Sequence, residues 1–221
     1  GIAAFELGRG YGRDAAGARQ EPRALSLLLC GTWPARGLER SGPAMEFADL
    51  KGALENVLAG LGWDDRIRWR AAADVPFLHP GKAARLMLGE RVLGVAGALH
   101  PETTQACDLP QEVWVAEVDF HGVALYEHPR VGVRSVPRFP AVSRDIAVIV
   151  DDDFPADAIL EEIRAVSDPL IESASVFDCY RGAPIPSGRK SLAYTIGYRA
   201  ADRTLTDDEV NAVFQKVQDE V

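Results

Sequence analysis

The last third of the chain switches repeatedly between two hydrophobic periods, and this pattern limits its fold more than any other feature. Apolar residues recur at every second position in some segments, as in strands, and at every third or fourth position in others, as in helices. Gly, Pro and Asp separate the segments. The expected order is strand 144–151, helix 155–166, strand 170–180, strand 190–199 and helix 206–221. This β-α-β-β-α order is the ferredoxin-like pattern with its last strand missing.

Residue types at the helix starts support these boundaries. Asp153 is the expected N-cap of the first helix, with Pro155 in its first turn. Thr206 and Glu209 have the spacing of a capping box at the start of the second helix. Residues 184–188 are typical of a hairpin loop.

Strand periodicity predicts which side chains face away from these helices, because successive residues point to opposite sides of a sheet. The side chains expected to face the helices are Ile146, Val148, Val150, Phe177, Cys179, Leu192, Tyr194, Ile196 and Tyr198. Those expected on the open face are Asp145, Ala147, Ile149, Asp178, Tyr180, Ser191, Ala193, Thr195 and Gly197. The open face is therefore mostly small and polar.

Four of the open-face residues could hold one purine base. Tyr180 could stack on the base, and Asp178 could accept from the N1–H and N2–H₂ of guanine. Ala147 would leave room for the ring, and Ser191 could add a hydrogen bond. Alternatively, Tyr180 covers the sheet and Asp178 pairs with Arg181 or Arg199, since exposed charges are usually solvated or loosely paired.

Residues 1–125 favour a second α+β domain with antiparallel strands around one long helix. The helix, 47–61, carries Phe47, Leu50, Leu54, Val57 and Leu58 at helical spacing. Strands are expected at 1–13 (with a turn), 24–30, 66–71, 83–88, 92–99 and 113–119, and a turn at 79–81. Residues 126–138 contain Pro129 and Pro137 and are interpreted as a linker between this domain and a domain at 139–221.

The first domain offers no convincing catalytic or metal site. His79 in its turn could be a general base, but no nucleophile or paired acid lies near it in sequence, which favours a structural role. Glu46 and Asp49 open the long helix, where carboxylates are expected from the helix dipole. Neither the three cysteines nor the four histidines have zinc-ligand spacing. We therefore predict no catalytic residue and no metal ligand.

Charge is distributed unevenly along the chain. The net charge of the protein is −9, and residues 139–221 contain 8 basic and 16 acidic groups. Five of these basic residues fall between Arg181 and Arg203. An acidic surface is a poor non-specific binder of nucleic acid, whereas a local basic edge suits contact at one spot. Arg181, Lys190 and Arg199 are the candidate phosphate contacts.

The remaining features favour a cytoplasmic protein without a membrane segment. Apolar runs are short, and the unpaired cysteines suit a reducing compartment. The chain opens at Gly1 without a Met, which favours the interpretation that it is part of a longer protein.

Eight motifs then point to one family. In the last domain they are Phe139-Pro-Ala-Val-Ser-Arg-Asp-Ile-Ala-Val-Ile-Val-Asp151, Val176-Phe-Asp-Cys-Tyr-Arg-Gly182, Gly188-Arg-Lys-Ser-Leu-Ala-Tyr194 and Arg203-Thr-Leu-Thr-Asp-Asp-Glu-Val-Asn211. In the first they are Phe5-Glu-Leu-Gly-Arg9, Phe47-Ala-Asp-Leu-Lys-Gly52, Leu78-His-Pro-Gly-Lys-Ala-Ala84 and Gly94-Val-Ala-Gly-Ala-Leu-His-Pro101. Together they resemble the C-terminal part of the beta subunit of bacterial-type phenylalanyl-tRNA synthetase.

The resemblance implies a degenerate, non-catalytic class II synthetase-like domain followed by a ferredoxin-fold anticodon-binding domain. It implies that Ala147, Asp178, Tyr180 and Ser191 bind the first anticodon base of tRNA(Phe), a guanine. It also implies a partner alpha subunit that joins phenylalanine to tRNA with ATP and magnesium, in a heterotetramer of two alpha and two beta chains. This chain alone would hold no cofactor and catalyse nothing.

Two alternatives remain open at this point. The chain could be a protein-interaction scaffold whose ferredoxin-like domain has lost RNA binding, and the acidic charge favours this. It could instead be a metabolite-binding regulatory domain, since ferredoxin-like folds often bind small molecules.

Overall fold

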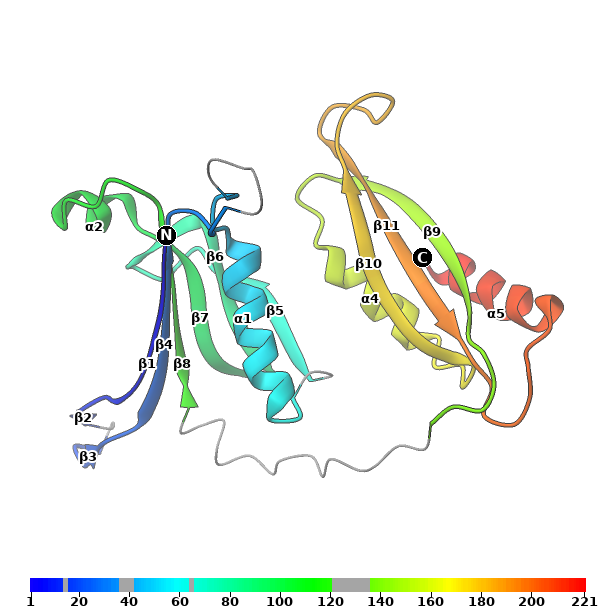
Figure 1. The fold of residues 1–221 in the computed structure, drawn as a ribbon, viewed down its shortest axis with the longest axis horizontal. Helices are drawn as coiled ribbons and strands as arrows, with labels where there is room; N and C mark the ends of the chain where they lie inside the picture. The colour runs from blue at the N-terminus through cyan, green and yellow to red at the C-terminus, as the bar shows by residue number, and fades with distance from the viewer. Residues whose placement is uncertain (14–15, 36–41, 64–65, 121–135) are drawn as a thin grey trace. The chain divides into compact units, whose positions relative to one another are not determined.

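The computed structural model describes residues 1–221 except 14–15, 36–41, 64–65 and 121–135. The chain divides into two compact units, Gly1–Gly132 and Val133–Val221 (Figure 1). Residues 126–135 of the predicted linker lie outside the described residues. Each unit is described by itself.

In its described residues, the first unit is built on a six-stranded antiparallel sheet in the order β1-β4-β8-β7-β6-β5 (Figure 1). The strands are β1 (Ile2–Arg9), β4 (Arg23–Cys30), β5 (Ile67–Ala71), β6 (Leu78–Leu88), β7 (Arg91–Leu99) and β8 (Val113–Asp119). A short hairpin, β2 (Gly12–Arg13) with β3 (Arg19–Gln20), extends from β1 and β4. The helices are α1 (Phe47–Gly60) and α2 (Pro101–Ala106).

Helix α1 covers one face of this sheet because its leucines form a buried stripe. Leu50, Leu54 and Leu58 are buried in one cluster with residues of β4, β6, β7 and β8. The indole N–H of Trp114 donates to the Met45 carbonyl at 2.9 Å and ties β8 to the entry of α1. The predicted antiparallel sheet and its packed helix are therefore confirmed.

One local expectation in this unit was wrong, and two further features were not anticipated. Residues 79–81 do not form a turn between elements but lie inside β6, where the pairing with β7 shifts between Leu78 and Ala83. Irregular pairing tolerates Pro80, which has no N–H to donate. Val57 is exposed, since it lies at the margin of the leucine stripe. Helix α2 was not predicted, because its six residues carry no apolar period.

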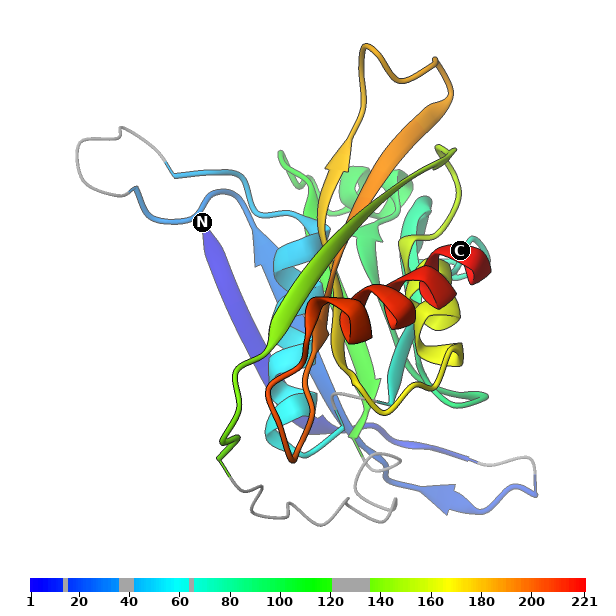
Figure 2. The same ribbon diagram turned by 90° about the vertical axis from the view of Figure 1, so that its right-hand side faces the viewer.

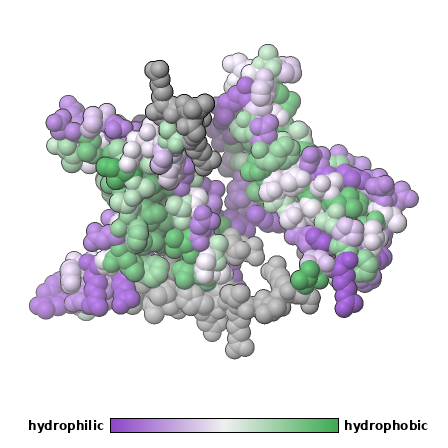
Figure 3. Space-filling view, viewed as in Figure 1, coloured by the Kyte–Doolittle hydropathy of each residue, from purple (hydrophilic) through white to green (hydrophobic). Residues whose placement is uncertain are grey.

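Exposed apolar residues gather on the outer strand of the first sheet. Ile2, Phe5 and Leu7 of β1 are all exposed, and Figure 3 shows an apolar area across the middle of the first unit. Helix α1 packs on the inner strands and leaves β1 uncovered within the described residues.

The second unit has the predicted β-α-β-β-α order. Its elements are β9 (Val142–Asp151), α4 (Ala156–Ala165), β10 (Ile171–Tyr180), β11 (Arg189–Tyr198) and α5 (Asp207–Glu220). The strand order is β10-β11-β9, with both pairings antiparallel. Helices α4 and α5 cover the same face of the sheet (Figures 1 and 2).

The core of this unit follows the predicted inward set on β11. Leu192, Tyr194, Ile196 and Tyr198 are all buried against α4 and α5. Burial raises the pKa of both Tyr194 and Tyr198 to about 12. The Tyr194 hydroxyl donates to the Ala156 carbonyl at 2.9 Å, so this ring also anchors the start of α4.

The two helix starts differ in how well the sequence predicted them. Thr206 and Glu209 form the expected capping box of α5. Asp153 is not the N-cap of α4, because the helix begins one residue after Pro155 and has no side-chain cap.

Candidate functional site

The face of the second sheet that points away from α4 and α5 carries all four predicted base-binding residues. Strand pairing arranges them in two adjacent rows across the sheet. One row runs Tyr180, Ser191, Ile149 and the next runs Asp178, Ala193, Ala147. We call these two rows the open-face rows. Cross-strand partners have their Cβ atoms about 4.5–5.5 Å apart, so Tyr180 and Ser191 are direct neighbours, and Asp178 is separated from Ala147 by Ala193.

A β-bulge brings Asp178 to this face. Val176 pairs with the inward Tyr194, yet Asp178, two residues on, pairs with the outward Ala193. The register shift between them inserts one extra residue, which reverses the side-chain alternation of β10. Without the bulge, Val176 and Asp178 would point to the same side.

Phe177, the extra residue, does not behave as predicted. It was expected to pack beneath the helices, but it is 57% exposed. Strict alternation predicted its burial, and the bulge removes that alternation at this point. Cys179 pairs with Leu192 and does lie on the helix side of the sheet, although it is also exposed at the sheet edge.

The Asp178 carboxylate has one local hydrogen bond. Its Oδ1 accepts from the Cys179 N–H at 2.9 Å. Neither arginine that could have neutralised it does so in the described structure: Arg181 donates to Asp152 at 2.6 Å, and Arg199 lies beside Leu170 at the other end of the strand pair, where it donates to Glu172 at 2.8 Å. An ionised carboxylate has about four acceptor positions, so Asp178 retains capacity for an incoming donor.

Tyr180 is held at the end of β10 by its hydroxyl, which donates to the Ala183 carbonyl at 2.8 Å. The phenol oxygen also lies close to Gly182, whose φ of 123° suits glycine alone. The ring is 47% exposed. Tyr180 therefore both fastens the loop after β10 and offers ring surface to a ligand.

The three candidate phosphate contacts are not equivalent. Lys190 is only 8% exposed, and its Nζ donates to the Asp152 carbonyl at 2.8 Å. It pairs with Val150 on the helix side of the sheet, as its even spacing from Leu192 could have indicated. Arg199 is partly buried and also donates to the Phe139 carbonyl. Arg181 is exposed, although it pairs with Asp152, and this ion pair raises the pKa of its guanidinium.

The candidate residues of the first unit have structural contacts. His79 accepts from the Gly81 N–H at 3.0 Å through Nδ1, which fixes its own bend in β6. Glu46 and Asp49 form a capping box at the start of α1. His100, which no sequence pattern singled out, caps α2 by accepting from the Glu102 N–H at 3.3 Å. Among the described residues, no group of three or more His, Cys, Asp or Glu side chains could hold a metal ion.

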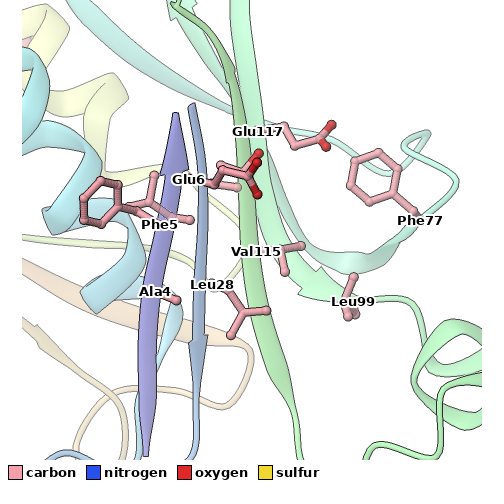
Figure 4. A pocket seen from close by; sticks show the side chains of 11 residues that line it. Ala4, Phe5, Glu6, Leu28, Phe77, Leu99, Val115 and Glu117 are labelled. Atoms are coloured by element: carbon pink, nitrogen blue, oxygen red, sulfur yellow. The ribbon is translucent and has the colours of Figure 1, made fainter. Parts of the chain in front are cut away.

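One groove lies on the face of the first sheet opposite α1 (Figure 4). Its volume is about 430 Å³, and its lining includes Leu28, Phe77 and Val115. Glu6 and Glu117 stand in one row of the sheet on either side of Ser26. Both glutamates are exposed and therefore solvated, and in the described part of the structure neither carboxylate is hydrogen-bonded to the Ser26 hydroxyl between them. We assign no chemistry to this groove.

Two protein-family models match the chain. The model for the phenylalanyl tRNA synthetase beta chain CLM domain matches residues 1–120. The model for the ferredoxin-fold anticodon binding domain matches residues 137–221.

Similar curated proteins carry the same description, phenylalanine–tRNA ligase beta subunit. The protein of Moorella thermoacetica is 43% identical over 98% of this chain and 27% of its own length. That of Symbiobacterium thermophilum is 40% identical over 99% of this chain and 24% of its own length. That of Geobacillus kaustophilus is 36% identical over 98% of this chain and 27% of its own length. The chain thus spans about a quarter of the length of these relatives. In the part of the chain that the structure describes, no helix is long and apolar enough to span a membrane.

Proposed function

The chain belongs to the phenylalanine–tRNA ligase beta subunit family, and on this premise we propose that its open-face rows recognise the anticodon of tRNA(Phe). The base is the first of the anticodon, a guanine. Tyr180 stacks on it, Asp178 accepts from its edge, Ser191 adds a hydrogen bond and Ala147 leaves room for the ring.

The observation that carries this proposal is the pairing of Asp178 with an outward position. The bulge in β10 places Asp178 beside Ala193 and Tyr180 beside Ser191, so a ring and a carboxylate share one small, uncovered area. Arg181 binds Asp152, and Arg199 lies at the other end of the strand pair, so neither makes Asp178 a merely structural ion-pair partner.

The chemistry of Asp178 favours guanine over other bases. Guanine presents N1–H and N2–H₂ side by side, and a carboxylate has two acceptor oxygens that match such a pair. Adenine presents an unprotonated ring nitrogen at the equivalent position and would face the carboxylate with a lone pair. A buried donor or acceptor left without a partner costs about 1–3 kcal/mol, which sets the size of the discrimination.

The first unit acts in this proposal as a scaffold. We propose that it is a degenerate class II synthetase-like domain that packs against a catalytic alpha subunit in a cytoplasmic heterotetramer of two alpha and two beta chains. The alpha subunit would supply the ATP- and magnesium-dependent attachment of phenylalanine to tRNA, and this chain would not catalyse it. The structural roles of His79, Glu46 and Asp49 support this division of labour.

Of the candidate phosphate contacts, only Arg181 enters the proposal. It is exposed and follows Tyr180 directly in the chain. Lys190 and Arg199 donate to the backbone carbonyls of Asp152 and Phe139 within their own domain, so moving either to a phosphate would break that hydrogen bond.

The test is a binding titration of the chain with tRNA(Phe). We expect Asp178→Asn to weaken binding by about 1.5–3 kcal/mol, or roughly 10- to 150-fold in Kd, because an acceptor is replaced by an NH₂ group that faces a donor. The loss should shrink for a tRNA whose first anticodon base is adenine.

Asp145→Asn is the matched control, since Asp145 lies on the same face but pairs with Thr195 outside the open-face rows. It removes the same charge and should change the Kd much less. Equal losses from both variants, or equal losses for both tRNAs, would show that Asp178 acts through charge or fold and not through the base.

A second candidate function, a protein-interaction scaffold that does not bind RNA, is favoured by one observation. The uncovered edge strand β1 presents Phe5 and Leu7 on one face and Ile2 on the other, and an exposed apolar edge strand is a template for pairing with another chain. The same titration separates the two functions, because a scaffold of this kind would not bind tRNA(Phe) in preference to other tRNAs.

A further inference from the structure

Ile149 lies in the first open-face row, on the far side of Ser191 from Tyr180. Ser191 pairs with Tyr180 on β10 and with Ile149 on β9. Ile149 is 48% exposed, almost the same fraction as Tyr180 at 47%. A half-exposed isoleucine does not by itself indicate a binding site. Its position in the same cross-strand row as Tyr180 does suggest one.

The spacing of the strands makes a slot between these two side chains. Neighbouring strands lie about 4.8 Å apart, so the backbones of β10 and β9 are about 10 Å apart across β11. A flat base in van der Waals contact on both faces needs two separations of about 3.5–4.0 Å, or about 7–8 Å in all. The short side chain of Ser191 forms the floor, and a base standing on it would have Tyr180 on one face and Ile149 on the other.

The second open-face row shows which way the base edge points. Asp178 is on the same side of the slot as Tyr180, whereas the positions across from it are Ala193 and Ala147. The carboxylate can therefore reach the edge of a base, and only methyl groups stand opposite.

We propose that Ile149 is the second wall of the base slot and packs on the face of the anticodon base opposite Tyr180. This inference rests on the proposed function of the open-face rows. Every base has two apolar faces, so this wall holds a base without regard to its identity. Ile149 and Tyr180 therefore contribute affinity for any base, and Asp178 provides the specificity for guanine.

The experiment measures binding of the chain to a fluorescent anticodon stem-loop of tRNA(Phe) and to a copy with adenine as the first anticodon base. We expect Ile149→Ala to raise the Kd by about three- to tenfold for both RNAs, because it removes most of one apolar contact surface. The ratio of the two Kd values should stay as in the unchanged chain. Ile149→Val, which keeps the branched carbon, should have less than half of this effect on a logarithmic scale.

Val176→Ala is the matched control. Val176 is also an exposed branched side chain of this sheet, but it pairs with Tyr194 on the side of the helices. It should leave both Kd values unchanged. Thermal unfolding of each variant checks the fold, and substitution of a half-exposed residue should shift it little.

The outcomes distinguish this inference from the proposed function. If Asp178→Asn and Tyr180→Ala weaken binding and Ile149→Ala does not, the second wall is refuted and anticodon recognition stands. If Ile149→Ala changes the ratio of the two Kd values as Asp178→Asn does, Ile149 contacts the base edge and the inference is wrong. If none of the three variants changes binding, the proposed function fails and the inference fails with it.

Discussion

At the scale of single residues, Tyr180 combines two roles that a substitution can separate. Its hydroxyl donates to the Ala183 carbonyl and fastens the loop after β10. The residue is half exposed and pairs with Ser191 in the first open-face row. The hydrogen bond keeps the ring in one orientation before a ligand arrives, and fixing a side chain in advance lowers the entropic cost of binding.

We therefore expect a graded response at Tyr180. Tyr180→Ala should weaken tRNA binding by about 1–3 kcal/mol through lost stacking. Tyr180→Phe keeps the stacking surface and loses only the tether, so it should weaken binding by less than about 1 kcal/mol. Titration of both variants with tRNA(Phe) measures the difference. Similar losses from Phe and Ala would mean that the loop contact, and not the ring, is what the site needs.

At the scale of elements, helix α5 begins with a closed set of hydrogen bonds. The Glu209 N–H donates to Thr206 Oγ1 at 3.4 Å, and the Thr206 N–H donates to Glu209 Oε2 at 2.9 Å. Arg203 donates to Glu209 Oε1 at 2.8 Å. The backbone N–H of Thr206 is the largest cause, and Arg203 the next, that lower the pKa of Glu209 to about 2.

This cap gives stability a defined pH dependence. The pKa of Glu209 in the folded chain is below its ordinary value of 4.5, so its contribution is fully present above about pH 4.5 and is lost as the pH falls toward about 2. We expect Glu209→Gln to lower the melting temperature at neutral pH. The difference in melting temperature between this variant and the unchanged chain should become smaller as the pH falls from about 4.5 to about 2. Thermal unfolding followed by circular dichroism measures it.

Glu220→Gln is a suitable comparison, because Glu220 is an exposed acid at the other end of the same helix. It should leave the melting curve nearly unchanged over the same range. The assignment would be wrong if the two variants showed the same loss at neutral pH.

At the scale of the whole molecule, the charge limits how the chain can meet RNA. Residues 139–221 carry twice as many acidic as basic groups. Lys190 and Arg199 donate hydrogen bonds to backbone carbonyls of the same domain. In the proposed complex, the affinity would therefore come mainly from contacts to the base, with few phosphates neutralised.

This predicts a weak salt dependence. A plot of the logarithm of the association constant for tRNA(Phe) against the logarithm of salt concentration should have a slope of about −1 to −2, since each phosphate contact contributes about −0.7 to −0.9. Arg181→Ala should make the slope less negative by nearly the contribution of one phosphate contact, about 0.7 to 0.9. Arg164→Ala, which removes a cation from helix α4, should leave it unchanged. A slope near −5 would show that a long phosphate track carries the binding.

Relations between residues close together in the chain determine much of the second unit. The order of its elements, the capping box of α5 and the inward set on β11 each depend on residues a few positions apart, and the sequence displays such relations directly. In the same way, the spacing of apolar residues predicts the antiparallel strands of the first unit and the helix that covers its sheet. The outward positions of Ala147, Asp178, Tyr180 and Ser191 were also predicted. On β10, however, the alternation that was used for this prediction is interrupted by the bulge between Val176 and Asp178.

Strand register is what only the tertiary structure decided. A bulge depends on how two strands pair, and residues 176–178 carry no local sign of it. The bulge turns Val176 inward, exposes Phe177 and brings Asp178 to the open face. Register also brought Ile149 beside Ser191 and let β6 continue through Pro80 and Gly81. The physical reason is that periodicity specifies which side of a strand is apolar, whereas its neighbours across the sheet depend on hydrogen bonds made by residues far away in the chain.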